Sequence, residues 1–290
     1  MERYYQIAGR TIRVALPDGA VFTGDGPLSP FAVEETGWDQ ELILQVVPEL
    51  PAPEGTPIYR DPGKRIYSCD GAIVRYDGAV EASLNGAITR IRREGERSFV
   101  QIREKSIPVG ITSRVILNAL EIDHLVARWG GVILHSSYII HDGCAILFTA
   151  PSGTGKSTQA ALWERYRDAQ VINGDRSILM PEGDRVMAYG LPFSGSSGIC
   201  KNCSAPVRAI VYLSQARENT ITRLRGLRGF RSLWEGCNLC RWDEQELELA
   251  TNTVMTILER VPVYHLACTP DEEAVKVLNQ AMNREAGIRQ

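Results

Sequence analysis

The chain has 290 residues, of which 44% are hydrophobic and 23% are charged, and its formal net charge is −3. This composition is typical of a globular protein with one large domain or two smaller ones, and the slight negative charge argues against nucleic acid or an anionic membrane as the main partner. The N-terminal sequence lacks an apolar signal segment, and no apolar run approaches the roughly 18 residues of a membrane span. We therefore expect a cytoplasmic protein that does not enter a membrane.

The first part of the chain is predicted to be rich in β-strands. Six segments alternate apolar with polar residues, or nearly so, and Gly, Pro and Asp punctuate them. These segments are residues 10–16, 41–47, 65–69, 72–78, 87–94 and 97–104. We expect them to form a β-rich N-terminal subdomain over residues 1–109. The alternative is that they extend the sheet of the second half.

The second part, residues 110–290, is predicted to be an α/β domain because strands and helices alternate along it. One helix is expected from Thr112 to Trp129, followed by two apolar strands around His141-Asp142-Gly143, a strong hairpin signal. Further helices are expected at 158–166, 229–235 and 243–260, and further strands at 169–174, 205–213 and 261–268. Two more strands, 177–183 and 184–190, are expected to form a hairpin around Glu182-Gly183-Asp184. A capping box at Thr269–Glu272 predicts the start of the last helix.

Residues 150–157 read A-P-S-G-T-G-K-S, which matches the phosphate-binding pattern G-x-x-x-x-G-K-[ST] except that Ala150 replaces the first Gly. Glycines in such a loop let backbone N–H groups turn towards phosphate oxygens, and the following helix presents its positive end to the same anion. Lys156 would neutralise the phosphates, and the Ser157 hydroxyl would ligate Mg²⁺. The residues expected to contact ATP are Ser152, Gly153, Thr154, Gly155, Lys156, Ser157 and Thr158.

An acidic residue follows the next apolar strand, in V-I-N-G-D-R. Asp175 is placed to hold Mg²⁺ or to accept a proton from an attacking hydroxyl. The alternative is an ordinary turn aspartate after Asn173-Gly174. Arg176 would contact phosphate or pair with an acid.

His135 on the strand before the hairpin, the glycine-rich loop A-P-S-G-T-G-K-S and Asp175 in N-G-D-R together resemble the HPr kinase/phosphorylase family, which has a phosphoenolpyruvate-carboxykinase-like P-loop fold. The resemblance covers roughly Gly110 to the C-terminus. It implies an antiparallel strand before the loop, Asp175 as base or magnesium ligand, and an active-site role for His135, whose alternative is a buried strand histidine. A homo-oligomer is expected only from this resemblance. The family usually carries two adjacent acids where this chain has Gly174-Asp175.

Two further features remain open at the level of sequence. The small residues Ser194–Gly198, with Lys201, form either a second anion-binding loop or an ordinary hairpin loop. Four cysteines form two Cys-x-x-Cys pairs, which would bind structural Zn²⁺ or remain free thiols. These cysteines are Cys200, Cys203, Cys237 and Cys240.

The leading functional hypothesis is an ATP- and Mg²⁺-dependent kinase acting on a hydroxyl of a protein, peptide or small molecule. Catalysis would rely on Lys156, Asp175 and His135, with Ser157 and Asp175 as the metal ligands. The second hypothesis is a nucleotide-binding regulatory protein with little or no phosphotransfer. A carboxykinase fits less well because the chain is short and lacks the extra metal ligands. An adenylate-kinase type fits less well because the strand into the loop is antiparallel to its predecessor.

Overall fold

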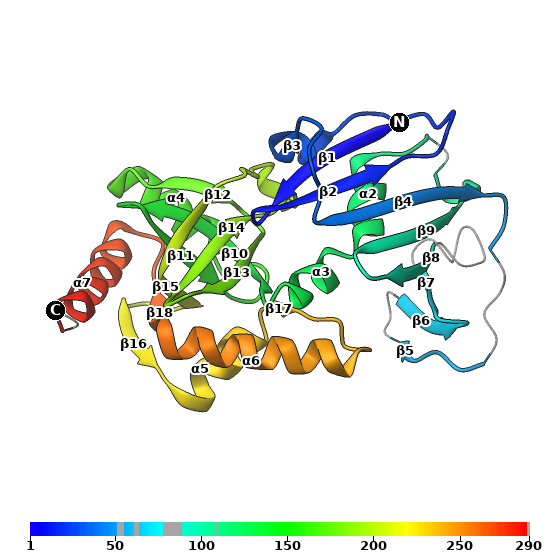
Figure 1. Ribbon diagram of the computed structural model, residues 1–290. Helices are drawn as coiled ribbons and strands as arrows, with labels where there is room; N and C mark the ends of the chain where they lie inside the picture. The colour runs from blue at the N-terminus through cyan, green and yellow to red at the C-terminus, as the bar shows by residue number, and fades with distance from the viewer. Residues whose placement is uncertain (51–54, 61–63, 78–88, 108, 289–290) are drawn as a thin grey trace. The chain divides into compact units, whose positions relative to one another are not determined.

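The structure is a computed structural model that describes residues 1–50, 55–60, 64–77, 89–107 and 109–288. The chain divides into two compact units, one of residues Met1–Ile122 with Arg241–Glu244 and the other of residues Asp123–Cys240 with Gln245–Gln290. Each unit contains its own large mixed sheet with helices, so the protein is of the α/β class (Figure 1). Among the described residues, no helix is both long and apolar enough to cross a membrane.

The N-terminal unit is built on a nine-stranded sheet in the order β3-β1-β2-β4-β9-β8-β7-β6-β5. Its pairs are antiparallel except β2 with β4 and β4 with β9. Its strands are β1 (Glu2–Ile7), β2 (Arg10–Ala15), β3 (Ala32–Val33), β4 (Gln40–Val47), β5 (Tyr59–Arg60), β6 (Lys64–Cys69), β7 (Ala72–Asp77), β8 (Thr89–Glu94) and β9 (Arg97–Arg103). Residues 78, 87 and 88 of the expected strands lie outside the described residues.

This sheet is separate from the sheet of the second unit, so the alternative that the N-terminal strands extend the latter is wrong. The sequence analysis missed β1, which a tight turn with positive φ at Ala8 and Gly9 joins to β2. Short 3-10 helices lie at η1 (Gly26–Phe31) and η2 (Glu104–Ser106).

The single helix expected from Thr112 to Trp129 is instead two helices, α2 (Ser113–Leu120) and α3 (Ile122–Arg128). Thr112 caps α2, because its hydroxyl accepts a hydrogen bond from the Val115 N–H at 3.2 Å. Glu121 between the helices is left-handed, with φ of 43°, and its buried carboxylate pairs with Arg93. A helix cannot continue through a left-handed residue, and this ion pair is a tertiary feature that apolar spacing does not reveal.

The sheet of the C-terminal unit runs β11-β10-β13-β14-β15-β18-β16, and a further pairing joins β11 to β15. The parallel strands β11, β15 and β18 lie side by side, and β10 pairs antiparallel with β11. Asp142 and Gly143 both have positive φ in the tight turn between β10 and β11, which confirms the expected hairpin. The strands are β10 (Val132–His141), β11 (Cys144–Thr149), β12 (Gln170–Asn173), β13 (Arg176–Glu182), β14 (Arg185–Gly190), β15 (Ser204–Gln215), β16 (Thr220–Leu224), β17 (Cys237–Asn238) and β18 (Val263–Cys268).

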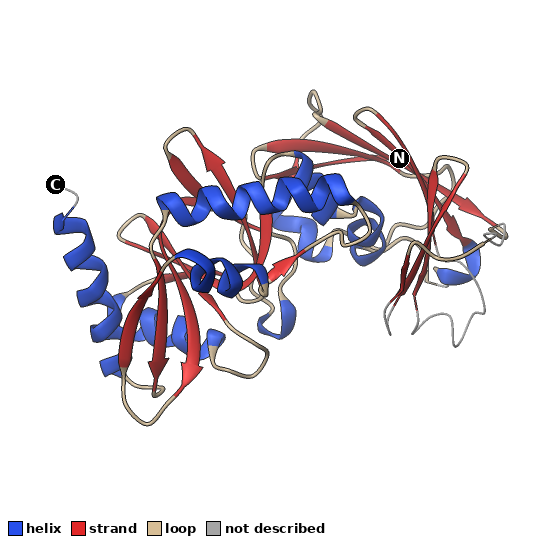
Figure 2. Ribbon diagram, turned by 90° about the horizontal axis from the view of Figure 1, so that it is seen from below, coloured by secondary structure: helices blue, strands red, loops and turns tan. Residues whose placement is uncertain are grey.

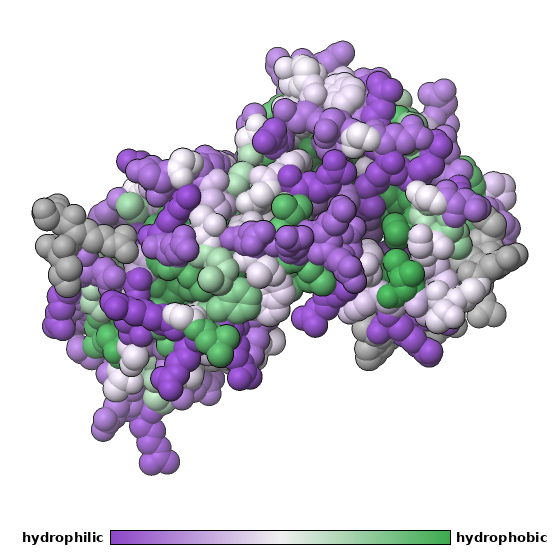
Figure 3. All heavy atoms as spheres, turned by 60° about the horizontal axis from the view of Figure 1, so that its bottom comes forward, coloured by the Kyte–Doolittle hydropathy of each residue, from purple (hydrophilic) through white to green (hydrophobic). Residues whose placement is uncertain are grey.

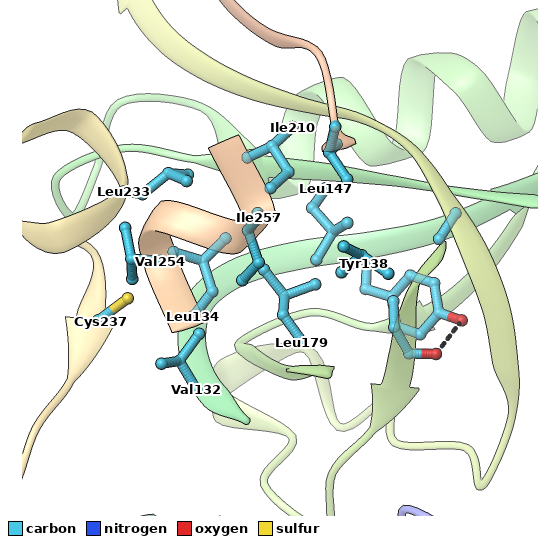
Figure 4. Packing of buried hydrophobic residues seen from close by; sticks show 14 of the residues in the cluster. Val132, Leu134, Tyr138, Leu147, Leu179, Ile210, Leu233, Cys237, Val254 and Ile257 are labelled. Atoms are coloured by element: carbon cyan, nitrogen blue, oxygen red, sulfur yellow. Dashed lines mark hydrogen bonds between the residues drawn. The ribbon is translucent and has the colours of Figure 1, made fainter. Parts of the chain in front are cut away.

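Helices pack against both faces of these strands (Figure 2). Helices α5 (Gly226–Trp234) and α6 (Glu244–Arg260) cover one hydrophobic cluster, to which they contribute Leu233, Val254 and Ile257 (Figure 4). Helices α4 (Lys156–Arg167) and α7 (Glu272–Ile288) cover a second cluster through side chains such as Trp163 and Leu278. Packing on both sides explains why β10, β11 and β15 are nearly continuous apolar runs.

Two details of this unit differ from expectation. Helix α7 begins at Glu272, and its cap is Asp271, whose carboxylate accepts a hydrogen bond from the Ala274 N–H at 3.2 Å. The expected cap, Thr269, instead donates its hydroxyl to Asp271 at 2.6 Å. Strand β16 was not expected, because its polar sequence shows no core face until it pairs with β18 at the edge of the sheet.

Candidate functional site

The glycine-rich loop, residues 150–155, joins the end of β11 to the first turn of α4. Gly153 has φ of 77° and Gly155 has φ of 120°, values that residues with a side chain rarely adopt. Gly155 is the N-cap of α4 and provides no side-chain cap. The N–H groups that begin a helix lack intrahelical acceptors, so the backbone of this loop and helix end offers donors of the kind that suit an anion. Ser157 and Thr158 are exposed in the same turn.

Lys156 folds back over this loop rather than reaching into solvent. Its Nζ donates to the Ala150 carbonyl at 3.0 Å and to the Pro151 carbonyl at 3.4 Å. Burial lowers the pKa of the ammonium group, while the negative charge of Asp175 opposes that shift. Two neutral carbonyls are weak partners for an ammonium group. An anion in the loop would therefore meet a positive charge that the protein already holds there.

His135 on β10 and Asp175, just before β13, lie next to each other. His135 Nε2 and Asp175 Oδ1 are 3.1 Å apart, and the Ser136 N–H donates to the Asp175 carbonyl at 2.9 Å. Arg176 Nε lies 3.2 Å from Asp175 Oδ2. The hydrogen bond from His135, followed by the charges of Arg176, His135 and Lys156, lowers the pKa of Asp175 although burial opposes this. Asp175 is therefore a carboxylate held ionised beside a histidine and within the field of Lys156.

Asn173 holds the turn that presents Asp175. Its side chain is fully buried, and its Oδ1 accepts from the N–H groups of Asp175 at 2.8 Å and Arg176 at 2.9 Å. Its Nδ2 donates to the Leu191 carbonyl at 2.7 Å. The sequence analysis treated Asn173 only as a turn residue. Its position at the end of an apolar strand could have indicated this role, because a buried amide side chain must find hydrogen-bond partners.

The loop of small residues, Ser194–Gly198, which includes the 3-10 helix η3 (Gly195–Ser197), packs directly on Gly174 and Asp175. A Cβ at Gly174 would lie 2.3 Å from the Ser197 hydroxyl, and a Cβ at Gly195 would lie 2.9 Å from the Asp175 Cβ. The space of a second acidic side chain at position 174 is thus taken by Ser197. The Arg176 guanidinium lies over the ring of Phe193, 5.1 Å from its centroid. Arg176 also pairs with Asp175, which is one of the two roles expected for it.

Two cavities flank the glycine-rich loop. The first, of about 400 Å³, is lined by loop and α4 residues together with Leu213, Gln215, Cys268 and Thr269 at the carboxyl ends of β15 and β18. We call it the strand-end cavity. The second, of about 370 Å³, is lined by His135, Ala150, Pro151, Tyr212 and the segment Glu235–Asn238. We call it the His135 cavity. Carboxyl ends of parallel strands are where α/β proteins bind ligands.

The sequence-predicted residues therefore gather around one loop, although they come from three elements. Ser152, Gly153, Thr154, Gly155, Ser157 and Thr158 belong to the loop and the first turn of α4. Asp175, which contacts His135, acts on Lys156 through its charge. Tyr212 and Glu235 were not predicted as site residues, because neither belongs to a local motif. Only the fold of β15 and the segment after α5 brings them to the His135 cavity.

The four cysteines of the two Cys-x-x-Cys pairs do not form a recognisable metal site. In the described part of the chain, no three His, Cys, Asp or Glu side chains gather as ligands for a metal ion. All four thiols are free of disulfide bonds, and burial raises the pKa of Cys237 to about 12. Cys203 and Cys237 pack instead against the hydrophobic cluster under α5 and α6.

Comparison with known proteins gives a distant structural likeness. No protein-family model matches the chain, and no curated protein matches it. Among solved structures, the Hpr(Ser) kinase/phosphatase from Coxiella burnetii aligns with 55% of this chain and 99% of its own, at 11% identity and a TM-score of 0.32. At this TM-score the relationship is a distant structural one, so the function of the chain must be inferred from the geometry of its own site.

Proposed function

We propose that this chain is an ATP- and Mg²⁺-dependent kinase that transfers the γ-phosphoryl group to a hydroxyl of a protein, peptide or small molecule. The observation that carries the proposal is the placement of Lys156. It spans a glycine-rich loop at a helix N-terminus, between two cavities, and shares an electrostatic field with an ionised Asp175. A loop that only turned the chain would not need a half-buried lysine beside a carboxylate.

On the donor side, the strand-end cavity suits the nucleoside. Leu213 and Cys268 supply apolar surface for a base, while Gln215 and Thr269 supply polar groups. The same cavity opens onto Gly155 and Thr158, so a base held there would leave its phosphates over the loop N–H groups. The volume of about 400 Å³ is within the usual range for small-ligand sites.

The residues present also fit a magnesium ion. Mg²⁺ in phosphoryl transfer commonly uses one or two protein oxygens and completes its shell with phosphates and water. Ser157 offers an exposed hydroxyl at the start of α4, and Asp175 offers an ionised carboxylate. When bound, the ion would neutralise charge on the β- and γ-phosphates.

On the acceptor side, the His135 cavity would receive the hydroxyl. The acceptor oxygen attacks the γ-phosphorus, the bond from that phosphorus to the β–γ bridging oxygen breaks, and ADP leaves with the bridging oxygen. Asp175 takes the proton from the hydroxyl, and its low pKa keeps it ready as an acceptor. The hydrogen bond from His135 orients the carboxylate at 3.1 Å. Lys156 stabilises the charge that develops on the transferred group.

The experiment that tests this proposal is Lys156→Ala, with Lys276→Ala, at a half-buried lysine of α7 that pairs with Glu272, as a matched control. Loss of a charged partner of phosphate should weaken ATP binding by about 10- to 150-fold, since hydrogen bonds to charged groups contribute about 1.5–3 kcal/mol. Binding is measured by calorimetry, and transfer by incubating labelled ATP with a fractionated extract of the host. Unchanged ATP affinity and transfer in Lys156→Ala, with an intact fold, would refute the assignment.

One observation favours a second candidate, a nucleotide-binding regulatory protein with little or no phosphotransfer. Ser197 packs where a second acid would stand, so Asp175 alone would have to serve both metal and acceptor. This candidate predicts ATP binding that depends on Lys156 together with no labelled product in any fraction. The kinase predicts labelled product that disappears in Asp175→Asn.

A further inference from the structure

Helix α5 has one buried and one exposed side. Gly229 lies against α6, where an added Cβ would be 3.0 Å from the Leu258 side chain, and Leu233 is 1% exposed. The other side presents Leu227, which is 81% exposed, with the exposed Arg228 and Arg231. Figure 3 brings the side of the unit that carries α5 and α6 forward and shows hydrophobic and hydrophilic side chains intermingled there. A single exposed leucine is common on protein surfaces, so the charge of this side carries the argument.

The charge of this side is positive although the whole chain carries a net charge of −3. Arg225 precedes the helix, and Arg228 and Arg231 follow within its first two turns. Arg231 pairs with Glu235 at 2.7 Å, with both side chains exposed. Within the ranges that the structure describes, no carboxylate pairs with Arg225 or Arg228. Two arginines are therefore available to a negatively charged partner.

The C-terminal end of α5 adjoins the His135 cavity. The helix ends at Trp234, and the next four residues, 235–238, line that cavity. The backbone holds the two together, because the His135 N–H donates to the Gly236 carbonyl at 2.8 Å and β17 pairs with β10. An extended ligand bound along α5 could thus continue past the end of the helix into the cavity.

We propose that the exposed side of α5, comprising Leu227 and Arg228 with Arg225 ahead of it, docks an acidic segment of a polypeptide acceptor whose hydroxyl enters the His135 cavity. The inference rests on the proposed kinase activity and narrows its acceptor to a polypeptide. Arg228 and Glu235 are seven residues apart on and just after the helix, about 10 Å at 1.5 Å per residue. An extended peptide spans that distance in about three residues. The acceptor should therefore carry acidic residues about three to four positions from its serine or threonine.

The test uses serine-centred peptides whose flanking positions are acidic, neutral or lysine-rich, with the full chain, ATP and Mg²⁺. The wild type should phosphorylate acidic peptides with the lowest KM. The double variant Arg225→Glu/Arg228→Glu should raise the KM for acidic peptides about tenfold or more and lower it for lysine-rich ones, because charge reversal replaces attraction by repulsion. Leu227→Ser should raise KM more modestly without changing the charge preference. Arg284→Glu, an exposed site on α7, is the matched control and should change neither.

Direct binding separates this inference from the proposed function. Fluorescence anisotropy of a labelled acidic peptide, with ADP and Mg²⁺ present, measures docking without transfer. Binding that weakens with salt and is lost in Arg225→Glu/Arg228→Glu supports the docking surface even if no peptide is phosphorylated, in which case the kinase proposal fails alone. Equal affinity or equal KM for acidic and lysine-rich peptides, or no response to the charge reversal, would overturn the docking surface whether or not Lys156-dependent transfer is observed.

Discussion

The contact between Gly174 and Ser197 yields a quantitative prediction. An added Cβ at position 174 would lie 2.3 Å from the Ser197 Oγ and 2.7 Å from its Cβ, so Ser197 must move by about 1 Å to restore van der Waals separation. Ser197 cannot move freely, since its hydroxyl donates to the Ser194 carbonyl at 2.7 Å and accepts from the Ile199 N–H at 3.2 Å. Gly174 does not have a positive φ, so alanine there introduces no backbone strain of its own.

Gly174→Ala should therefore destabilise the protein by about 1–3 kcal/mol, the usual cost of overpacking and of two weakened hydrogen bonds. Ser197→Gly alone should cost about 1 kcal/mol, because it removes the same two bonds from an exposed loop. The double variant should be more stable than the sum of the two predicts by about 1–2 kcal/mol, because the obstacle is gone.

Urea unfolding of the four proteins measures this coupling, and phosphotransfer measured in parallel reports on the site. The matched control pairs Gly174→Ala with Ser204→Gly, a serine at the exposed start of β15. If the effects of Gly174→Ala and Ser197→Gly add within about 0.3–0.5 kcal/mol, the two positions do not share space. The claim that Ser197 occupies the space of a second acidic side chain at position 174 would then be wrong. Gly174→Asp should lower activity, because a carboxylate would displace the loop that packs on Asp175.

Three other results are expected. Asn173→Ala should destabilise the protein by about 2–4 kcal/mol in urea unfolding, since it orphans two N–H groups and a carbonyl in a buried position, and a cost below about 1 kcal/mol would argue against that hydrogen-bond set. Because the folded pKa of Asp175 lies below 3.8, its ionised form contributes stability that is present above pH 3.8 and lost as pH falls through the lower folded pKa. The stability difference between wild type and Asp175→Asn should shrink over that acid range, and a constant difference in acid unfolding curves would contradict the pKa shift. Gly155→Ala, at φ of 120°, should weaken ATP binding and stability more than Gly153→Ala, at φ of 77°, because neither added Cβ meets an atom closer than 4.0 Å and backbone strain alone separates them; equal effects in calorimetry and unfolding would reject that reason.

Local patterns were sufficient where the physical signal is local. Apolar runs placed β10, β11 and β15, and Asp142-Gly143 placed the hairpin before the glycine-rich loop. The loop itself is readable because positive φ at its glycines and the N–H groups of the next helix are properties of neighbouring residues. Helical periodicity, however, wrongly predicted one continuous helix through Glu121. The break is accompanied by a buried ion pair with Arg93, which is a long-range contact.

What the sequence by itself determined is the glycine-rich turn before a helix and the kinds of side chain around it. Only the tertiary structure decided how these groups cooperate. Asp175 meets His135 because β10 crosses beside the turn that Asn173 fixes, and their separation of 40 residues leaves no local trace. Gly174 likewise looked like a missing acid until the loop at Ser197 was seen to fill the same space. Side-chain packing and hydrogen bonding across strands are non-local, so they emerge only when the sheet has brought distant segments together.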